Sequence, residues 1–284
     1  DGGSTWRIMV RAVTRQSLTG IHTIDPSFVW ASGLRGTILR TTNSGQSWDS
    51  LATGTGSTLS DVYFLNPLLG WTVGNSGTIL RTTDGGDSWS RQPTPIVRQW
   101  RDIEFSYYPV GWIVGGDALS DGRLLKTTNG GNAWNEVQSL VLPQGASQIQ
   151  FTSESHGWIL AGSAITGSTQ AVYRTTNDGN NWVPMLTSNS DTVFSSMSFV
   201  SNLKGWVSTI EYVLYRTDDA GATWRRFPTP FFFESLCFVD SLNGWAGAAV
   251  TGEIYRTTDG GESWTPQFSP MNGPIMDLKF SGRH

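Results

Sequence analysis

The sequence predicts an all-β fold, a seven-bladed β-propeller built from four-stranded antiparallel blades. Two observations lead to this prediction. A short signature ending in tryptophan recurs every 40 to 48 residues, which is the length of one propeller blade. A second tryptophan, usually preceded by glycine, recurs ahead of the signature and keeps the same phase. Thirteen of the fourteen tryptophans therefore occupy repeat positions, and only Trp100 stands outside them.

The signature is expected to form a tight turn. TTDGGDSW, ending at Trp89, and TTDGGESW, ending at Trp264, are complete copies. An Asp or Asn opens the turn by accepting backbone N–H bonds, and a glycine two residues later is expected to adopt a positive φ. We assign a structural role to the acidic or amide residues and to the closing tryptophans of all seven copies: Asp1, Asn43, Asp84, Asn129, Asn177, Asp219, Asp259, Trp6, Trp48, Trp89, Trp134, Trp182, Trp224 and Trp264.

One repeat shows how each blade is expected to fold. The β-branched and aromatic run 58–65 predicts the first strand, and the Asn-Pro segment 66–70 turns the chain. Tight turns at 75–77 and 84–88 separate the remaining strands. The second, third and fourth strands are expected at 71–74, 78–83 and 89–92.

Six repeats are complete, and the seventh is divided between the two ends of the chain. Residues 1–10 match a signature turn and an outer strand, whereas 274–280 match a first strand. We therefore expect the termini to share one incomplete blade in a single domain spanning 1–284, which protects the sheet edges. The sequence shows no signal peptide, and because Asp1 falls inside a signature we expect a processed or trimmed form.

Composition excludes several classes of function. A net charge of −4, from 19 Lys and Arg against 23 Asp and Glu, creates no field attractive to nucleic acid. Every apolar run is shorter than the roughly 20 residues of a membrane span. The lone cysteine, Cys237, lies in an apolar run and is expected to be a buried thiol. The histidines are scattered without zinc-site spacing, so we expect no metal and no cofactor.

These repeats resemble the Asp-box, or BNR, repeat. The longer pattern GWTVGNSGTILRTTDGGDSW over 70–89 is similar to that of the photosystem II stability/assembly factor-like propellers. Members in photosynthetic organisms are lumenal assembly chaperones, so the resemblance implies a non-catalytic, exported scaffold that binds a protein partner. We expect the chain to be a monomer. Similar repeats occur in sialidases, xyloglucan-degrading enzymes, lyases and lectins. A carbohydrate-binding lectin, or a polysaccharide-active glycoside hydrolase or lyase, is therefore the alternative.

Candidate residues for enzymatic chemistry are few. Sialidase chemistry needs an arginine triad and a Tyr/Glu pair, and Tyr212 beside Glu211 is the one adjacent pair of that type. Alternation along a strand would direct these two side chains to opposite faces. Three first-strand carboxylates, Asp61, Asp102 and Asp277, share one column when the repeats are aligned. A cation site is one interpretation of this column, and capping of backbone groups at the strand ends is the favoured one.

Arginine is the most informative residue type for binding. One set of basic residues recurs just before each signature, which favours hydrogen bonding between blades: Arg40, Arg81, Lys126, Arg174, Arg216 and Arg256. Two other segments, 98–102 and 225–234, combine arginines with aromatic residues outside the repeat pattern. Arg and Trp are enriched at interaction hot spots. We predict a partner-binding surface on the loop face that includes Arg98, Trp100, Arg101, Arg225, Arg226 and Phe227.

Overall fold

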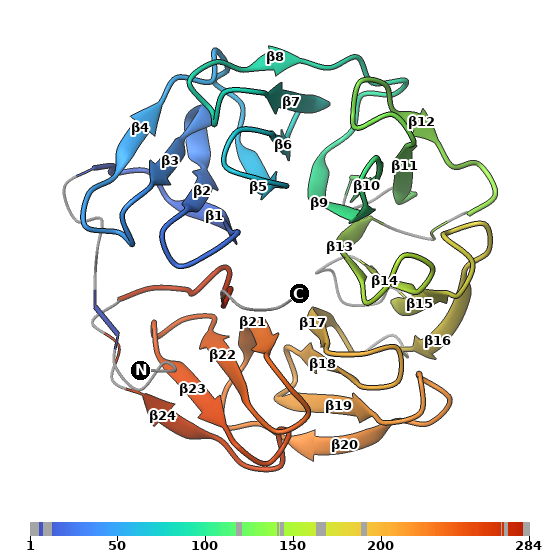
Figure 1. The fold of residues 1–284 in the computed structure, drawn as a ribbon. Coiled ribbons are helices and arrows are strands. Elements are labelled where there is room, and N and C mark those ends of the chain that lie inside the picture. The colour runs from blue at the N-terminus through green and yellow to red at the C-terminus, as the bar shows by residue number, and fades with distance from the viewer. Residues whose placement is uncertain are drawn as a thin grey trace. The chain divides into compact units, whose positions relative to one another are not determined.

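The protein is an all-β propeller of four-stranded antiparallel blades, six of which are described (Figure 1). In each blade four consecutive strands lie side by side in chain order, as the repeat predicts. The computed structural model describes residues 6–7, 13–117, 121–140, 142, 145–162, 169–188, 192–267, 269 and 272–280.

The chain divides into two compact units. The N-terminal unit contains Met9–Ile149 and Lys279–His284, and the C-terminal unit contains Asp1–Ile8 and Gln150–Leu278. Three blades lie in the N-terminal unit: β1 (Leu18–Thr23), β2 (Val29–Gly33), β3 (Ile38–Thr41) and β4 (Asp49–Leu51); β5 (Leu59–Phe64), β6 (Gly70–Gly74), β7 (Thr78–Thr82) and β8 (Ser90–Arg91); and β9 (Trp100–Tyr107), β10 (Val110–Gly115), β11 (Arg123–Thr127) and β12 (Asn135–Glu136). A single 3-10 turn, η1 (Leu34–Gly36), joins β2 to β3.

The other three blades follow along the chain, and their first strand, β13, begins in the last residues of the N-terminal unit. Their strands are β13 (Ala146–Phe151), β14 (Gly157–Ala161), β15 (Ala171–Thr175) and β16 (Val183–Thr187); β17 (Phe194–Phe199), β18 (Gly205–Thr209), β19 (Val213–Thr217) and β20 (Arg225–Pro228); and β21 (Phe233–Phe238), β22 (Gly244–Ala248), β23 (Ile254–Thr257) and β24 (Thr265–Gln267). The expected single domain over 1–284 stays a prediction.

The signature turn forms as predicted. Asp84 Oδ1 accepts the N–H of Ser88 at 2.9 Å and the hydroxyl of Thr82 at 2.7 Å, while Thr82 Oγ1 accepts the N–H of Gly86 at 2.9 Å. Gly86 has a φ of 100°, a conformation that a side chain would strain. The five other described copies repeat these bonds, which confirms the structural role of their Asp or Asn. The copy at Asp1 lies outside the described residues.

Hydrogen bonding in this turn makes the fold sensitive to acid. Bonds from the Ser88 hydroxyl and N–H, with a further one from Thr82, lower the pKa of Asp84 from its ordinary 3.8 to about 2. Bonds from Thr223 likewise lower the pKa of Asp219. A carboxyl whose pKa is lower in the folded state stabilises the fold above its unfolded pKa, and this contribution disappears as the pH falls through the folded value.

We expect the double variant Asp84→Asn/Asp219→Asn to lose less stability than the parent between pH 4 and pH 2. Asparagine already fills this turn position at Asn43, Asn129 and Asn177, so the variant should remain folded at pH 7. Denaturant midpoints measured at half-unit pH steps would check the prediction. Identical slopes for both proteins below pH 4 would contradict it.

Tryptophan and phenylalanine rings interlock neighbouring blades. Trp206 on β18 stacks on Phe238 of the next blade, with 3.7 Å between ring centroids and 1° between planes. Its indole N–H donates to the Gly260 carbonyl at 2.8 Å. The signature residue Trp264 meets Phe238 edge-on at 5.9 Å. The same stacking joins Trp30 to Phe64 and Trp158 to Phe199. These contacts confirm that the repeated tryptophans are packing residues.

A glycine precedes the second-strand tryptophan because the phenylalanine ring of the same blade lies across it. A Cβ atom at Gly205 would stand 2.0 Å from the Phe199 ring, and one at Gly70 would stand 2.5 Å from Phe64. The requirement is space, since neither glycine has a positive φ. The glycine and the phenylalanine seven residues before the tryptophan are therefore one packing unit.

The divided seventh blade is only partly described. Its expected outer segment, 1–10, lies outside the described residues apart from 6–7. Residues 274–280 form no strand in the described part of the chain, and in this respect the expectation of a strand was wrong. Ile275 and Leu278 are nevertheless buried, and the Ile275 N–H donates to the Ala248 carbonyl at 3.2 Å. The segment packs on the neighbouring blade without a second strand to pair with among the described residues.

Candidate functional site

Trp100 lies in the protein core. It begins β9, none of its side chain is exposed, and it packs in one buried cluster with Trp71 and Ile103. The prediction that Trp100 contributes to a binding surface was therefore wrong. Its position is part of the repeat, because the residue five places before the first-strand phenylalanine is apolar in other blades as well. These equivalents are Leu59, Ala146, Phe194 and Phe233.

Arg225, Arg226 and Phe227 lie in a strand, β20, and not in a loop. Arg225 Nη2 is 3.8 Å from Glu262 Oε1 in the next signature turn, and Arg226 stacks over the ring of Tyr215 at 5.5 Å. Phe227 is half-buried against the core. The prediction that Arg225 faces the loop side was wrong, because it lies at the signature end of its blade. Whether Arg226 and Phe227 bind a partner stays a prediction.

Arg98 and Arg101 belong to the N-terminal unit, whereas residues 225–227 belong to the C-terminal unit. Arg98 is half-buried, and its carbonyl accepts the Gly77 N–H at 2.8 Å. Arg101 is exposed, and its Nη2 donates to Gln99 Oε1 at 2.9 Å. A binding surface shared by both predicted segments stays a prediction.

The first-strand carboxylates cap the backbone of the next blade. Asp61 Oδ2 accepts the N–H of Ile103 at 3.2 Å, and Asp102 Oδ2 accepts the N–H of Ile149 at 2.7 Å. In the C-terminal unit, Ser196 occupies the same column, and its hydroxyl accepts the corresponding N–H of Leu236 at 3.2 Å. No group of three or more Asp, Glu, His or Cys residues suited to a metal ion occurs in the described part of the chain. For Asp61 and Asp102 these bonds confirm the favoured interpretation, backbone capping, whereas Asp277 Oδ1 accepts the N–H of its neighbour Leu278 at 2.8 Å.

Replacing Asp102 by Ala is expected to lower the free energy of unfolding by about 1–3 kcal/mol, because the N–H of buried Ile149 would lose its acceptor. Urea unfolding of the variant and the parent would measure the difference. The opposing interpretation makes a separate prediction: Ca²⁺ would raise the melting temperature of the parent and not that of Asp102→Ala. That result would contradict the capping role.

The pair of Tyr212 and Glu211 is not arranged for nucleophilic catalysis. Both carboxylate oxygens of Glu211 accept the N–H of Val193, at 3.0 and 3.3 Å. Tyr212 occupies the tip of the turn between β18 and β19 with a φ of 61°, and its carbonyl accepts the N–H of Thr229 at 2.9 Å. Glu211 therefore fixes the backbone that enters β17, and it does not activate the Tyr212 hydroxyl.

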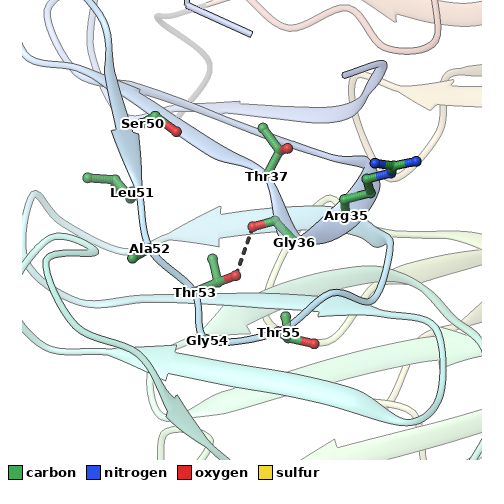
Figure 2. Close-up of a pocket in the computed structure, with 9 residues that line it drawn as sticks. All are labelled: Arg35, Gly36, Thr37, Ser50, Leu51, Ala52, Thr53, Gly54 and Thr55. Atoms are coloured by element: carbon green, nitrogen blue, oxygen red, sulfur yellow. Dashed lines mark hydrogen bonds between the residues drawn. The ribbon is translucent and has the colours of Figure 1, made fainter. Parts of the chain in front are cut away.

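A shallow pocket of about 360 Å³ lies beside η1 in the N-terminal unit (Figure 2). Two of its lining residues are joined by a hydrogen bond, from the Thr53 hydroxyl to the Gly36 carbonyl at 2.8 Å. Arg35 is the one charged residue that lines it, with a positive φ of 56° at the turn. The lining residues contain no carboxylate, so this pocket lacks the acid pair that glycoside hydrolysis requires.

The repeated basic residues have two structural roles. Arg40 Nη1 donates to the Gly85 carbonyl at 3.2 Å and to the Asp87 carboxylate at 2.9 Å, and Arg216 Nη1 donates to the Gly260 carbonyl at 3.5 Å. These bonds confirm, for these two arginines, the predicted link between blades. The other four lie over the tryptophan of their own second strand: Arg81, Lys126, Arg174 and Arg256.

Comparison with known proteins identifies the family. The family model described as photosynthesis system II assembly factor YCF48 matches residues 41–182 and 136–283. No curated protein sequence matches the chain significantly. The described residues contain no helix long and apolar enough to cross a membrane.

Three solved structures share the fold. YCF48 from Cyanidioschyzon merolae is 20% identical with a TM-score of 0.72, over 91% of this chain and 87% of that one. A structure of YCF48 bound to D1 peptide is 22% identical with a TM-score of 0.71, over 89% and 82%. The GH74 xyloglucanase from Xanthomonas campestris is 16% identical with a TM-score of 0.72, over 89% of this chain and 45% of that one. At these identities the likeness shows the fold alone.

Proposed function

The chain belongs to the family of the photosynthesis system II assembly factor YCF48, and we propose that it is a non-catalytic, exported scaffold that binds a peptide segment of a protein partner. The observation that carries the proposal is the family match across residues 41–283. YCF48 is an assembly factor, and one YCF48 structure holds a D1 peptide. That relationship supports the proposal that this chain binds a peptide.

Three carboxylates that were candidates for chemistry are hydrogen-bonded to the backbone among the described residues, and this supports a binding role. Asp61, Asp102 and Glu211 each accept a backbone N–H, so the first-strand column and the Tyr/Glu pair serve the fold. In each case the carboxylate is engaged with the backbone of the fold. Recognition then depends on the loops between strands, which vary among blades.

We also propose that the propeller has seven blades, with the seventh shared between the termini. Residues 274–280 repeat the apolar spacing of a first strand, and the Ser235 hydroxyl donates to the Ile275 carbonyl at 2.9 Å. Deleting 272–284 should therefore lower the melting temperature by uncovering the blade that contains β21. An unchanged melting temperature would count against a seventh blade.

The test of the proposed function pairs a peptide assay with a carbohydrate assay. Calorimetric titration with the D1 peptide, and selection from a random-peptide display library, should yield at least one saturable peptide ligand. A scrambled version of that peptide should bind at least tenfold more weakly. Incubation with xyloglucan and a panel of other polysaccharides should release no sugar. Sugar release or glycan-array binding, with no peptide selected, would replace this function by the carbohydrate alternative.

A further inference from the structure

Three loop tips and one terminal segment of the C-terminal unit expose apolar side chains. Tyr212, in the β18–β19 turn, is 53% exposed, and Phe231, between β20 and β21, is 39% exposed. Val250, in the β22–β23 turn, is 77% exposed, and Met276 is 43% exposed. We call these four residues the apolar edge. Scattered single residues of this kind are ordinary, whereas a contiguous set marks an interaction site.

Backbone hydrogen bonds place the segments that carry the apolar edge side by side. The Tyr212 carbonyl accepts the N–H of Thr229, two residues before Phe231, at 2.9 Å. Phe232, which follows Phe231, accepts the N–H of Ala249 on its carbonyl at 3.1 Å, and Ala249 precedes Val250. Ile275, the residue before Met276, donates its N–H to the carbonyl of Ala248 at 3.2 Å. The backbone segments that carry the four residues therefore adjoin one another across two neighbouring blades.

The conformation of Tyr212 is costly to its own turn. Its φ of 61° lies in the left-handed region, where a bulky aromatic residue is an outlier and where Gly or Asn is favoured. More than half of the side chain is exposed, so burial of the ring does not offset this strain. A strained residue that exposes an aromatic ring is a marker of function when a partner can bury the ring.

The three loops of the apolar edge carry two carboxylates and no Lys or Arg, while the terminal segment with Met276 carries one residue of each sign, Asp277 and Lys279. Glu211 and Glu253 lie on the two turns that carry Tyr212 and Val250. The Glu253 carboxylate is held in place by the hydroxyls of Thr251, at 3.0 Å, and Tyr255, at 2.9 Å. Residues 205–215 and 229–255 contain no Lys or Arg. A partner that complements this surface has apolar side chains and cationic ones.

We propose that the apolar edge is a docking surface for an extended peptide segment of a protein partner, in which apolar residues alternate with Lys or Arg. The inference rests on the proposed function and names the surface and the chemistry of the partner. Apolar side chains of the segment cover Tyr212, Phe231 and Val250, while its cations pair with Glu211 and Glu253. This surface is distinct from the arginine segments at 98–101 and 225–226.

Two fluorescein-labelled peptides test the charge preference. One is a ten-residue peptide of alternating Leu and Lys, and the other alternates Leu and Glu. Fluorescence anisotropy with the full chain should show at least tenfold tighter binding of the Leu–Lys peptide. The double variant Glu211→Gln/Glu253→Gln should reduce this preference at least threefold. Equal affinity of the parent for the two peptides would overturn the proposal.

Tyr212→Asn separates binding from folding. Asparagine tolerates the left-handed conformation, so the melting temperature should stay the same or rise. Affinity for the Leu–Lys peptide should nevertheless fall at least tenfold, because the ring is lost. The matched control is Leu203→Ser, which removes a 56%-exposed leucine from the β17–β18 turn of the same blade and should leave affinity unchanged. Equal loss in both variants, or none in Tyr212→Asn, would contradict the proposal.

The peptides obtained by display selection distinguish this inference from the proposed function. If selected peptides bind the parent and Tyr212→Asn equally, the chain is a peptide-binding scaffold and the apolar edge is not its docking surface. If no peptide binds and a polysaccharide does, the proposed function fails and this inference fails with it. Selected peptides that are rich in Lys or Arg and weakened by Tyr212→Asn support both.

Discussion

Replacing Trp100 by Ala is expected to lower the free energy of unfolding by about 3–5 kcal/mol. The ring is fully buried at the start of β9 and packs with Trp71 and Ile103, so its removal leaves a cavity in the core. Equilibrium unfolding in urea, followed by circular dichroism, measures the loss. This prediction concerns the stability of the chain alone, whereas an interaction hot spot would predict a loss of affinity for a partner.

A matched variant controls for the loss of a large side chain. Val97→Ala changes a neighbouring residue that is 66% exposed, and its effect on stability should stay within about 0.5 kcal/mol. If Trp100→Ala were as stable as the parent, the buried position of this tryptophan would be refuted. The predicted binding surface that includes it would then regain support.

Replacing Gly205 by Ala is expected to cost about 3 kcal/mol, because the added methyl would stand 2.0 Å from the ring of Phe199. The ring stacks on Trp158 of the preceding blade, at 3.9 Å between centroids, so it cannot move without opening that contact. The double variant Gly205→Ala/Phe199→Leu should recover part of the loss. Urea unfolding of the single and double variants measures the coupling between the two sites.

Gly56 provides the control for this substitution. It does not have a positive φ, and a Cβ atom there would meet nothing within 4 Å. Gly56→Ala should therefore leave the stability unchanged or raise it by up to about 1 kcal/mol. Equal destabilisation by Gly56→Ala and Gly205→Ala would show that loss of glycine itself, rather than contact with Phe199, causes the effect.

Much of the fold could be predicted because the same residues recur at equivalent positions of each repeat, where they meet the same physical requirement. The Asp or Asn of each signature closes a turn, and the Gly-Trp pair follows a phenylalanine at a fixed distance. Repetition also indicated that Asp61 and Asp102 are structural rather than catalytic, since Ser196 occupies the equivalent position in another blade and accepts the corresponding hydrogen bond. A column that accepts either Asp or Ser serves a hydrogen bond that both can make.

The candidate site was harder to predict, for two physical reasons. Trp100 does not occupy either of the repeated tryptophan positions. It does occupy a first-strand position that is apolar in other blades, as at Leu59 and Phe233. Comparing the repeats by burial rather than by residue type reveals this equivalence. Arg225 follows Trp224 directly, so the fourth strand of its blade includes it. The prediction that 225–234 forms a loop did not take into account the strand that follows the signature.

The repeat places Tyr212 between the second and third strands of its blade, but its left-handed conformation could not be predicted from sequence. Positive φ is expected of Gly and Asn, and a tyrosine between Glu and Val suggests a strand. The Val213 N–H donates to Thr209 Oγ1 at 3.3 Å, and this bond helps to close the turn instead. The exposure of the ring is a property of the folded turn, and only the structure reveals it.

Hydrogen–deuterium exchange with bound peptide tests most directly whether binding depends on loop tips while the repeats hold the fold. The full chain is compared with and without saturating Leu–Lys peptide. The account predicts slower exchange in 210–213, 229–232 and 249–252, and unchanged exchange in the signature turns, including 218–223 and 259–263. Protection of the signature turns, with no change at the three loop tips, would contradict it.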